Sequence, residues 1–209
     1  MDAIILAGGK GSRMEANLPK ALVEVRGKPI IAHQIDYLLS QPGVDTIILS
    51  LGHQGSFVQE YVQMRYADTP IICSIEEGLL GTAGGLKLAF TRATSPRVLV
   101  LNCDDITDIH IADLEGGTEH MICVAHPCLP FGRVHEVDGY AVFEEKPILE
   151  DWTSCGWYCF NREELLPLLP DEGSLEYDVF PKIKLKVYHH TGSWRTLNTK
   201  KDVQEFEKG

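Results

Sequence analysis

The chain has 209 residues, of which 44% are hydrophobic, and its formal net charge is -11. A chain of this length and composition can form one large domain with a sizeable core, and its acidity argues against nucleic acid or an anionic membrane surface as the main partner. No long apolar run is present, so no membrane span is expected. The N-terminus has the pattern of a first strand and not of a signal peptide, which favours the cytoplasm.

The N-terminal half alternates predicted strands and helices. Apolar runs predict strands at 3–7, 46–51, 70–75 and 97–101, and apolar residues at helical spacing predict helices at 29–39, 57–66 and 84–91. This alternation predicts an α/β fold built on a mixed, mostly parallel central sheet. Ligands bind at the carboxyl ends of strands in such sheets, so the loops after the first and fourth strands are expected to share one cleft.

The C-terminal half is richer in predicted strands. These fall at 120–125, 132–137, 140–143, 154–160 and 185–189, and short helices are predicted at 162–169 and 200–207. The Asp138-Gly139 pair is typical of a two-residue hairpin turn. We therefore expect a single domain, 1–209, in which residues from about 120 to 190 form a smaller strand-rich lobe.

A glycine-rich loop follows the first predicted strand. Residues 6–14 read LAGGKGSRM, and Pro19-Lys20 follows them. Glycines let backbone N–H groups approach phosphate oxygens, and Arg13 and Lys20 supply positive charge. The loop lacks the spacing of a dinucleotide-binding loop and of a Walker A loop. Taken alone it indicates phosphate binding, with a plain structural turn as the alternative.

An acidic cluster follows the fourth predicted strand. Residues 102–108 read NCDDITD and contain Asp104, Asp105 and Asp108. Clustered carboxylates at a strand end are costly unless water or a metal ion compensates their charge. The cluster therefore predicts either a metal site or a solvated acidic turn.

These two features and four later motifs resemble the sugar-1-phosphate nucleotidyltransferases, most closely the mannose- and heptose-1-phosphate guanylyltransferases. The later motifs are EEGLLGTAG at 76–84, FEEKP at 143–147, GWY at 156–158 and SLE at 174–176. The resemblance extends from residue 1 to residue 206. It implies a Rossmann-like three-layer sandwich of the nucleotide-diphospho-sugar transferase type, in which the strand-rich lobe binds the sugar.

The resemblance also implies roles for single residues. Arg13 would meet the outer phosphates, Lys20 the phosphate under attack and Lys146 the sugar phosphate, while Asp104 would bind Mg²⁺. The other implied nucleotide-binding residues are Leu6, Ala7, Gly8, Gly9, Lys10, Gly11, Ser12, Glu76, Gly81 and Thr82. The implied sugar-binding residues are Glu145, Gly156 and Glu176.

Glu76 bears on the choice of nucleotide. A carboxylate only accepts hydrogen bonds, and guanine offers two adjacent donors, N1–H and the exocyclic amine. Thymine and uracil offer one donor between two carbonyl oxygens, which a carboxylate would repel. Relatives that use these bases tend to carry glutamine here. Glu76 therefore favours GTP, with a solvent-facing side chain as the alternative.

A last motif, residues 194–199 followed by Asp202, departs from the family pattern. Thr196 stands where the family often has an aspartate that is a second metal ligand. We therefore expect either Asn198 or Asp108 to supply the second ligand, or Asp104 to hold the metal with phosphates and water.

The implied reaction joins an NTP and a sugar 1-phosphate, giving an NDP-sugar and pyrophosphate. One alternative is a nucleotidyltransferase for a non-sugar acceptor, a cofactor or alcohol phosphate, against which Lys146 argues. Another is a non-catalytic nucleotide or sugar-nucleotide sensor, which Thr196 keeps open. The oligomeric state stays open, and a homodimer is compatible with the sequence.

Overall fold

A seven-stranded sheet forms the centre of the computed structural model, which describes residues 1–9, 11 and 18–208. The strand order is β12-β8-β11-β6-β1-β4-β5. The strands are β1 (Asp2–Leu6), β4 (Thr46–Leu51), β5 (Ile71–Ile75), β6 (Arg97–Asn102), β8 (Met121–Ala125), β11 (Thr153–Asn161) and β12 (Lys186–His189). Only β11 is antiparallel to its neighbours, β6 and β8. The predicted mixed, mostly parallel sheet is confirmed.

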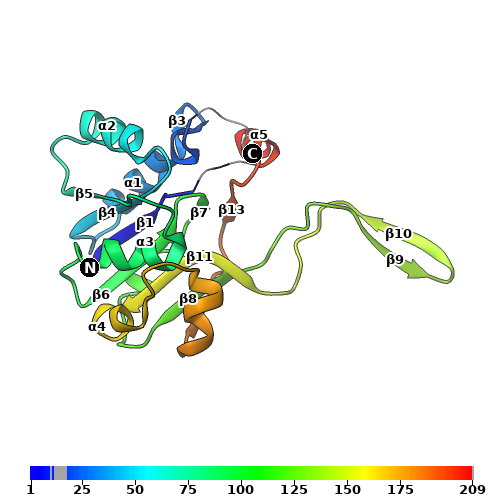
Figure 1. The fold of residues 1–209 in the computed structure, drawn as a ribbon. Helices are drawn as coiled ribbons and strands as arrows, with labels where there is room; N and C mark the ends of the chain where they lie inside the picture. Colours follow the sequence, from blue (N-terminus) through cyan, green and yellow to red (C-terminus); the bar gives the residue numbers. More distant parts are fainter. Residues whose placement is uncertain (10, 12–17, 209) are drawn as a thin grey trace.

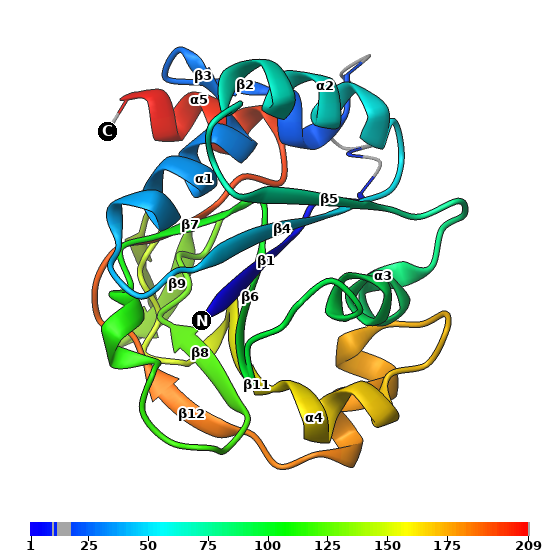
Figure 2. The ribbon, with the colours of Figure 1, turned by 90° about the vertical axis from the view of Figure 1, so that its left-hand side faces the viewer.

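Helices cover both faces of this sheet (Figure 2). One face carries α1 (Ile30–Ser40) and α2 (Gly55–Arg65), and the other carries α3 (Gly81–Phe90) and α4 (Arg162–Leu165). Successive side chains of β1 point to opposite faces of the sheet and pack under the helices on each face. Ala3 and Ile5 pack into the core cluster that contains α1 residues, whereas Ile4 packs with α3 residues. A strand buried on both faces is apolar throughout, which is the pattern that its sequence shows.

Two short strand pairs tie distant parts of the chain together. β2 (Glu24–Val25) pairs with β3 (Lys28–Pro29) ahead of α1. β7 (Asp105–Thr107) pairs antiparallel with β13 (Trp194–Thr196), and this brings the C-terminal segment beside the loop that follows β6. The chain ends with α5 (Lys200–Lys208). None of these four short strands was predicted.

A β-ribbon made of β9 (Arg133–Val137) and β10 (Tyr140–Glu144) stands away from the rest of the molecule (Figure 1). Asp138 and Gly139 form its turn with φ of 52° and 82°. Two residues with positive φ are what a type I′ turn requires, so the predicted hairpin is confirmed. Every residue of both strands is exposed. The other predicted strands of this half, β8, β11 and β12, belong to the central sheet.

Helical turns fill the remaining connections. They are the 3-10 turns Lys20–Leu22, Ile111–Asp113, Leu166–Leu168 and Phe180–Lys182 and the π-turn Leu175–Val179. The helix predicted at 162–169 is split into α4 and one of these 3-10 turns. Within the part of the chain that the structure describes, no helix has the length and apolar character needed to span a bilayer.

Candidate functional site

A cavity of ≈ 540 Å³ opens at the carboxyl ends of β1 and β6. β1 ends at Leu6 and β6 ends at Asn102, and both residues line the cavity. The loops after these two strands therefore share one cleft, as their order in the sequence predicted. The described lining residues are Leu6, Ala7, Gly8, Gly9, Gly11, Lys20, Ala21, Ser50, Glu76, Leu79, Gly81, Thr82, Gly85, Asn102, Cys103, Asp104, Glu176 and Asn198.

The glycine-rich loop forms one wall of the cavity. Gly11 has a φ of 59°, and a Cβ at this position would lie 2.8 Å from the Cβ of Lys20. Glycine alone combines this backbone conformation with such a close approach at no steric cost. Three residues of this loop that were predicted to bind the nucleotide, Lys10, Ser12 and Arg13, lie outside the described residues.

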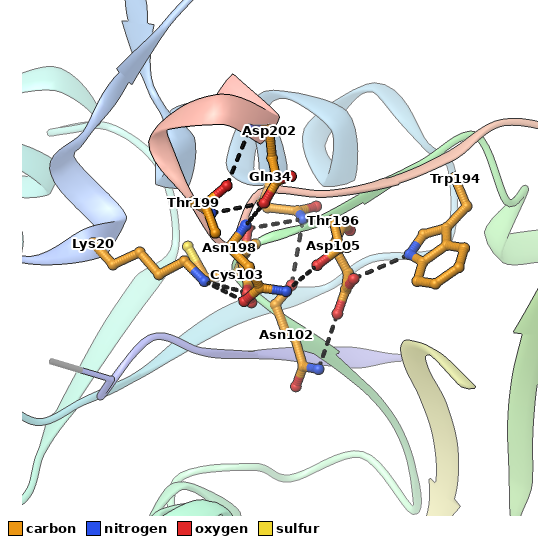
Figure 3. A network of polar contacts seen from close by, with 11 residues as sticks. Lys20, Gln34, Asn102, Cys103, Asp105, Trp194, Thr196, Asn198, Thr199 and Asp202 are labelled. Atoms are coloured by element: carbon orange, nitrogen blue, oxygen red, sulfur yellow. Dashed lines mark hydrogen bonds and ion pairs between the residues drawn. The ribbon is translucent and has the colours of Figure 1, made fainter. Parts of the chain in front are cut away.

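The ammonium of Lys20 joins two oxygen-bearing side chains from distant parts of the chain. It donates to the carboxylate of Asp104, which follows β6. It also donates to Oδ1 of Asn198, which follows β13, at 2.9 Å (Figure 3). The Lys20 and Asp104 side chains are only 17% and 21% exposed. The structure thus brings together the two residues that the glycine-loop motif and the acidic cluster singled out.

The amide of Asn198 has a fixed orientation. Its Nδ2 donates to Oγ1 of Thr196 at 2.8 Å, which leaves Oδ1 facing Lys20 (Figure 3). The backbone N–H groups of Asn198 and Thr199 donate to the Asp202 carboxylate at 3.0 and 2.7 Å, and the Asp202 N–H donates back to Oγ1 of Thr199. This reciprocal pattern is a capping box at the start of α5. Thr196 thus acts on the site by accepting the hydrogen bond from Asn198 Nδ2, and the capping box fixes the backbone of Asn198.

The side-chain oxygens of Asp104 and Asn198 are ligand atoms that suit Mg²⁺. Carboxylate and amide oxygens are hard ligands, and here both already converge on one cation, the Lys20 ammonium. Asp108, the other candidate for a second ligand, accepts instead from the Ser193 N–H at 2.7 Å and contacts Nε2 of His190 at 2.8 Å. Among the described residues, no group of three or more His, Cys, Asp or Glu side chains could hold a metal ion.

Asp105 lies behind the cavity and is 7% exposed. Burial, together with the nearby charge of Asp104, raises the pKa of Asp105 to about 6. Its carboxylate accepts hydrogen bonds from Nδ2 of Asn102 and Nε1 of Trp194, both at 3.0 Å (Figure 3). Gly156 packs against it, because a Cβ on Gly156 would lie 2.0 Å from Oδ2. Gly156 therefore supports the site from behind and does not line the cavity.

Glu76 lines the cavity near the glycine loop. Its Oε2 accepts from the Leu80 N–H at 3.2 Å, and burial raises the pKa of its carboxyl. Gly8 and Gly52 leave room for the carboxylate, because a Cβ on either would lie 3.0 or 2.1 Å from Oε1. The carboxylate therefore lies against the backbone of the cavity wall and does not point into bulk solvent.

Gly81, Thr82 and Glu176 meet at another wall of the cavity. Oγ1 of Thr82 accepts from the Leu175 N–H at 2.9 Å and lies 3.4 Å from Oε2 of Glu176. Gly81 has a φ of 73°, and a Cβ there would lie 2.3 Å from the Gly173 carbonyl oxygen. The start of α3 and the π-turn are thus locked together, which places two predicted motifs side by side.

Lys146 and Glu145 lie outside the described lining of the cavity. Lys146 has a φ of 47°, and its ammonium forms an ion pair with Glu205 of α5. Glu145 is exposed. Both residues lie just after β10, where the ribbon returns to the body of the molecule.

Sequence reasoning missed Gln34, Trp157 and Trp194, which hold the turn that carries Asp104. Gln34 and Trp157 Nε1 donate to the Asp105 carbonyl at 2.9 and 3.1 Å. Gln34 carried a signal, because it is a polar residue inside the apolar stripe of a predicted helix. The tryptophans belong to the motifs at 156–158 and 194–199, but these motifs did not indicate their hydrogen bonds to Asp105, which is distant in the sequence.

Known proteins resemble this chain in sequence. A family model described as the MobA-like NTP transferase domain matches residues 3–126. A D-glycero-alpha-D-manno-heptose 1-phosphate guanylyltransferase of Aneurinibacillus thermoaerophilus is 38% identical over 109 residues, which cover 51% of this chain and 47% of that protein. A mannose-1-phosphate guanyltransferase of Schizosaccharomyces pombe is 31% identical over 229 aligned positions, which cover 97% of this chain and 62% of that protein.

The fold is shared with solved structures. The crystal structure of HddC from Yersinia pseudotuberculosis complexed with GMP-PN superimposes with a TM-score of 0.82 at 23% identity, covering 99% of this chain and 98% of that one. The inositol-1-phosphate CTP transferase from T. maritima superimposes with a TM-score of 0.74 at 16% identity, covering 99% and 94%. At these identities the likeness concerns the fold alone.

This chain spans between about half and three-fifths of the length of the curated relatives that it matches. The family model nevertheless covers more than half of the chain, and its span contains the glycine loop, Lys20, Glu76 and Asp104. The chain belongs to the family of MobA-like NTP transferase domains.

Proposed function

We propose that the chain transfers a nucleotidyl group from an NTP, with GTP favoured, to a sugar 1-phosphate and releases pyrophosphate. The observation that carries the proposal is the junction of Lys20, Asp104 and Asn198 beside the glycine-rich loop. The mannose- and heptose-1-phosphate guanylyltransferases among the relatives support this acceptor class.

In the proposed reaction, an oxygen of the sugar 1-phosphate attacks the α-phosphorus of the NTP. The new P–O bond forms as the bond from the α-phosphorus to the bridging oxygen of pyrophosphate breaks. The attacking phosphate oxygen is ionised at neutral pH, so no general base is needed. The protein must position two polyanions and offset their charge.

The chain's own residues meet these needs in distinct ways. The glycine loop offers backbone N–H groups to the phosphates, and the Lys20 ammonium stabilises negative charge that develops on the α-phosphate. Asp104 with Asn198 would hold Mg²⁺, which when bound offsets phosphate charge and orients phosphate oxygens. Arg13 is assigned the outer phosphates on the sequence motif.

Glu76 is the proposed reader of the base. Its carboxylate would accept hydrogen bonds from the two adjacent donors of guanine, with the Leu80 N–H holding one of its oxygens in place. Glu176, which lines the cavity beside Thr82, is assigned to hydroxyl groups of the sugar. Glu145 is assigned to the sugar and Lys146 to its phosphate. This requires the Lys146 ammonium to leave its ion pair with Glu205 and bind the acceptor phosphate instead.

The position of Lys146 also favours a second candidate, transfer to a non-sugar phosphate acceptor. Lys146 is paired with Glu205 of α5 and lies outside the described cavity lining, which is the arrangement expected if the acceptor does not need this lysine. A structure that shares this fold, from T. maritima, is by name an inositol-1-phosphate CTP transferase.

A pyrophosphate-release screen tests the proposal. Four NTPs are crossed with mannose, heptose and glucose 1-phosphates and inositol 1-phosphate in the presence of Mg²⁺. We expect the highest kcat/KM for GTP with a mannose- or heptose-type 1-phosphate. Faster turnover of the inositol phosphate would favour the second candidate, and NTP binding without pyrophosphate release for any acceptor would contradict both.

A further inference from the structure

A buried amide lies on the far side of the Asp104 turn from the cavity. Gln34 belongs to α1, is 2% exposed and sits in a helix face whose other buried residues are apolar. Burying an amide without hydrogen bonds is costly, and a leucine or methionine would fill the same space without this cost. Packing alone therefore does not explain why a glutamine occupies this buried position.

The Gln34 amide is aimed at three backbone carbonyl oxygens. Its Nε2 lies 2.9 Å from the oxygen of Asp105, 3.1 Å from that of Cys103 and 3.4 Å from that of Asn102 (Figure 3). Carbonyl oxygens only accept, so the NH₂ side of the amide must face them. Its two hydrogens serve the two short contacts, which flank Asp104 in the sequence.

The turn that carries Asp104 is thus held from one side while its carboxylate faces the other. Gln34 binds the carbonyls before and after Asp104, and the Asp104 carbonyl itself accepts from the Leu197 N–H at 2.8 Å. None of these donors touches the Asp104 carboxylate, which faces Lys20 in the cavity. The amide therefore fixes the backbone of this turn without competing for the carboxylate.

We propose that Gln34 is a positioning residue that sets the Asp104 carboxylate for metal binding in nucleotidyl transfer; this rests on the proposed function. Without the amide, the Cys103 and Asp105 carbonyls lose this donor, and of the two only Asp105 still accepts from Trp157 Nε1, so the turn is held less firmly before Asp104. Groups that orient a metal ligand from behind affect metal affinity about 10- to 100-fold when they are removed.

The test replaces Gln34 with methionine, which keeps the length and loses the donors. The Mg²⁺ concentration for half-maximal pyrophosphate release is expected to rise about 10-fold or more, with the KM for sugar 1-phosphate within about twofold of wild type. The matched control is Leu38→Ala on the same buried helix face, which loses apolar contacts and removes no hydrogen-bond donor to the turn. It should lower Tm and leave the Mg²⁺ requirement within about twofold.

A second readout needs no turnover. Hydrogen exchange of the backbone amides at 103–107 is expected to quicken in Gln34→Met and not in Leu38→Ala. If Gln34→Met does not fold, Gln34→Glu takes its place, because its protonated carboxyl keeps one donor.

Unchanged exchange at 103–107, or an unchanged Mg²⁺ requirement in an active Gln34 variant, would overturn the role of Gln34. A wild-type protein that releases no pyrophosphate would overturn the proposed function instead. The exchange measurement would then decide alone whether Gln34 holds the turn.

Discussion

Lys20 is the one lysine or arginine among the described residues that line the cavity. The chain carries a net charge of -11, so a triphosphate and a sugar phosphate would meet mostly negative surroundings. A half-buried ammonium is screened less than a surface one, which makes a single lysine effective here. Its two partners, Asp104 and Asn198, keep it aimed into the cavity.

We predict that Lys20→Ala and Asp104→Ala each lower kcat for pyrophosphate release by about a hundredfold or more, the cost of one pre-organised charge stabiliser. Lys28→Ala is the matched control, because Lys28 pairs with Asp36 away from the cavity at 2.5 Å. It should leave kcat within about twofold, since exposed ion pairs contribute little. Near-wild-type turnover in either cavity variant would remove that residue from the proposed machinery.

Glu76 gives the base preference a pH dependence. Burial raises the pKa of Glu76, so this carboxyl takes up a proton at a higher pH than an exposed glutamate. The ionised form accepts from guanine, so the GTP:ATP ratio of kcat/KM should be constant above this pKa and fall as the pH drops through it.

A neutral variant of Glu76 tests whether its carboxylate recognises the base. Glu76→Gln should lower the GTP:ATP ratio by about tenfold at neutral pH and abolish its pH dependence, in line with the loss of one good hydrogen-bonded pair. The exposed neighbour Glu77 supplies the control, and Glu77→Gln should behave as wild type. An NTP ranking that survives Glu76→Gln would place base recognition elsewhere.

At the residue scale, most of the residues that the motifs singled out lie around one cavity, and their chemical roles stay predictions. Lys20, Asp104, Glu76 and Glu176 come from four motifs, and the fold gathers them around one cavity. Gly156 was expected to bind the sugar, but it packs behind Asp105. A motif specifies which residue types recur, whereas the side of the backbone that faces the cavity depends on strand pairing.

At the element scale, the long strands of the first half could be predicted because β1, β4 and β6 are apolar and buried on both faces, and α1 has an apolar stripe. The strand at 46–51 matches β4 at both ends. The β7–β13 pair could not be predicted, since each strand has three residues and the paired residues, such as Thr196 and Asp105, lie far apart in the sequence. Such short strands form only because tertiary packing brings them together.

The β9–β10 ribbon and β11 differ in what their aromatic residues contribute to stability. Phe143 on the ribbon is 65% exposed, whereas Phe160 on β11 is fully buried. Phe160→Ala should lower the free energy of unfolding by about 3–5 kcal/mol through the cavity it leaves. Phe143→Ser should change it by less than about 0.5 kcal/mol.

Chemical denaturation measures both values with the same m-value analysis. A large loss in Phe143→Ser would mean that the ribbon is packed against another surface in solution. That result would contradict the arrangement in which the ribbon stands free of the body (Figure 1).

At the scale of the whole molecule, the central sheet places the site. β1 and β6 are parallel neighbours, so their carboxyl ends open at the same edge and bring the glycine loop beside Asp104. The C-terminal segment then closes over this edge through β13 and delivers Asn198. The sequence predicted the first of these relations from strand order, and the second only through family resemblance.

The central claim is transfer of the α-phosphoryl group with its nucleoside. The most direct test incubates the protein with mannose 1-phosphate or the heptose 1-phosphate and GTP labelled either at the α- or at the γ-phosphate. We predict that the α-label enters a GDP-sugar and that the γ-label leaves as pyrophosphate. Release of the γ-label as orthophosphate, or an α-label that stays in GTP or GDP with every acceptor, would contradict it.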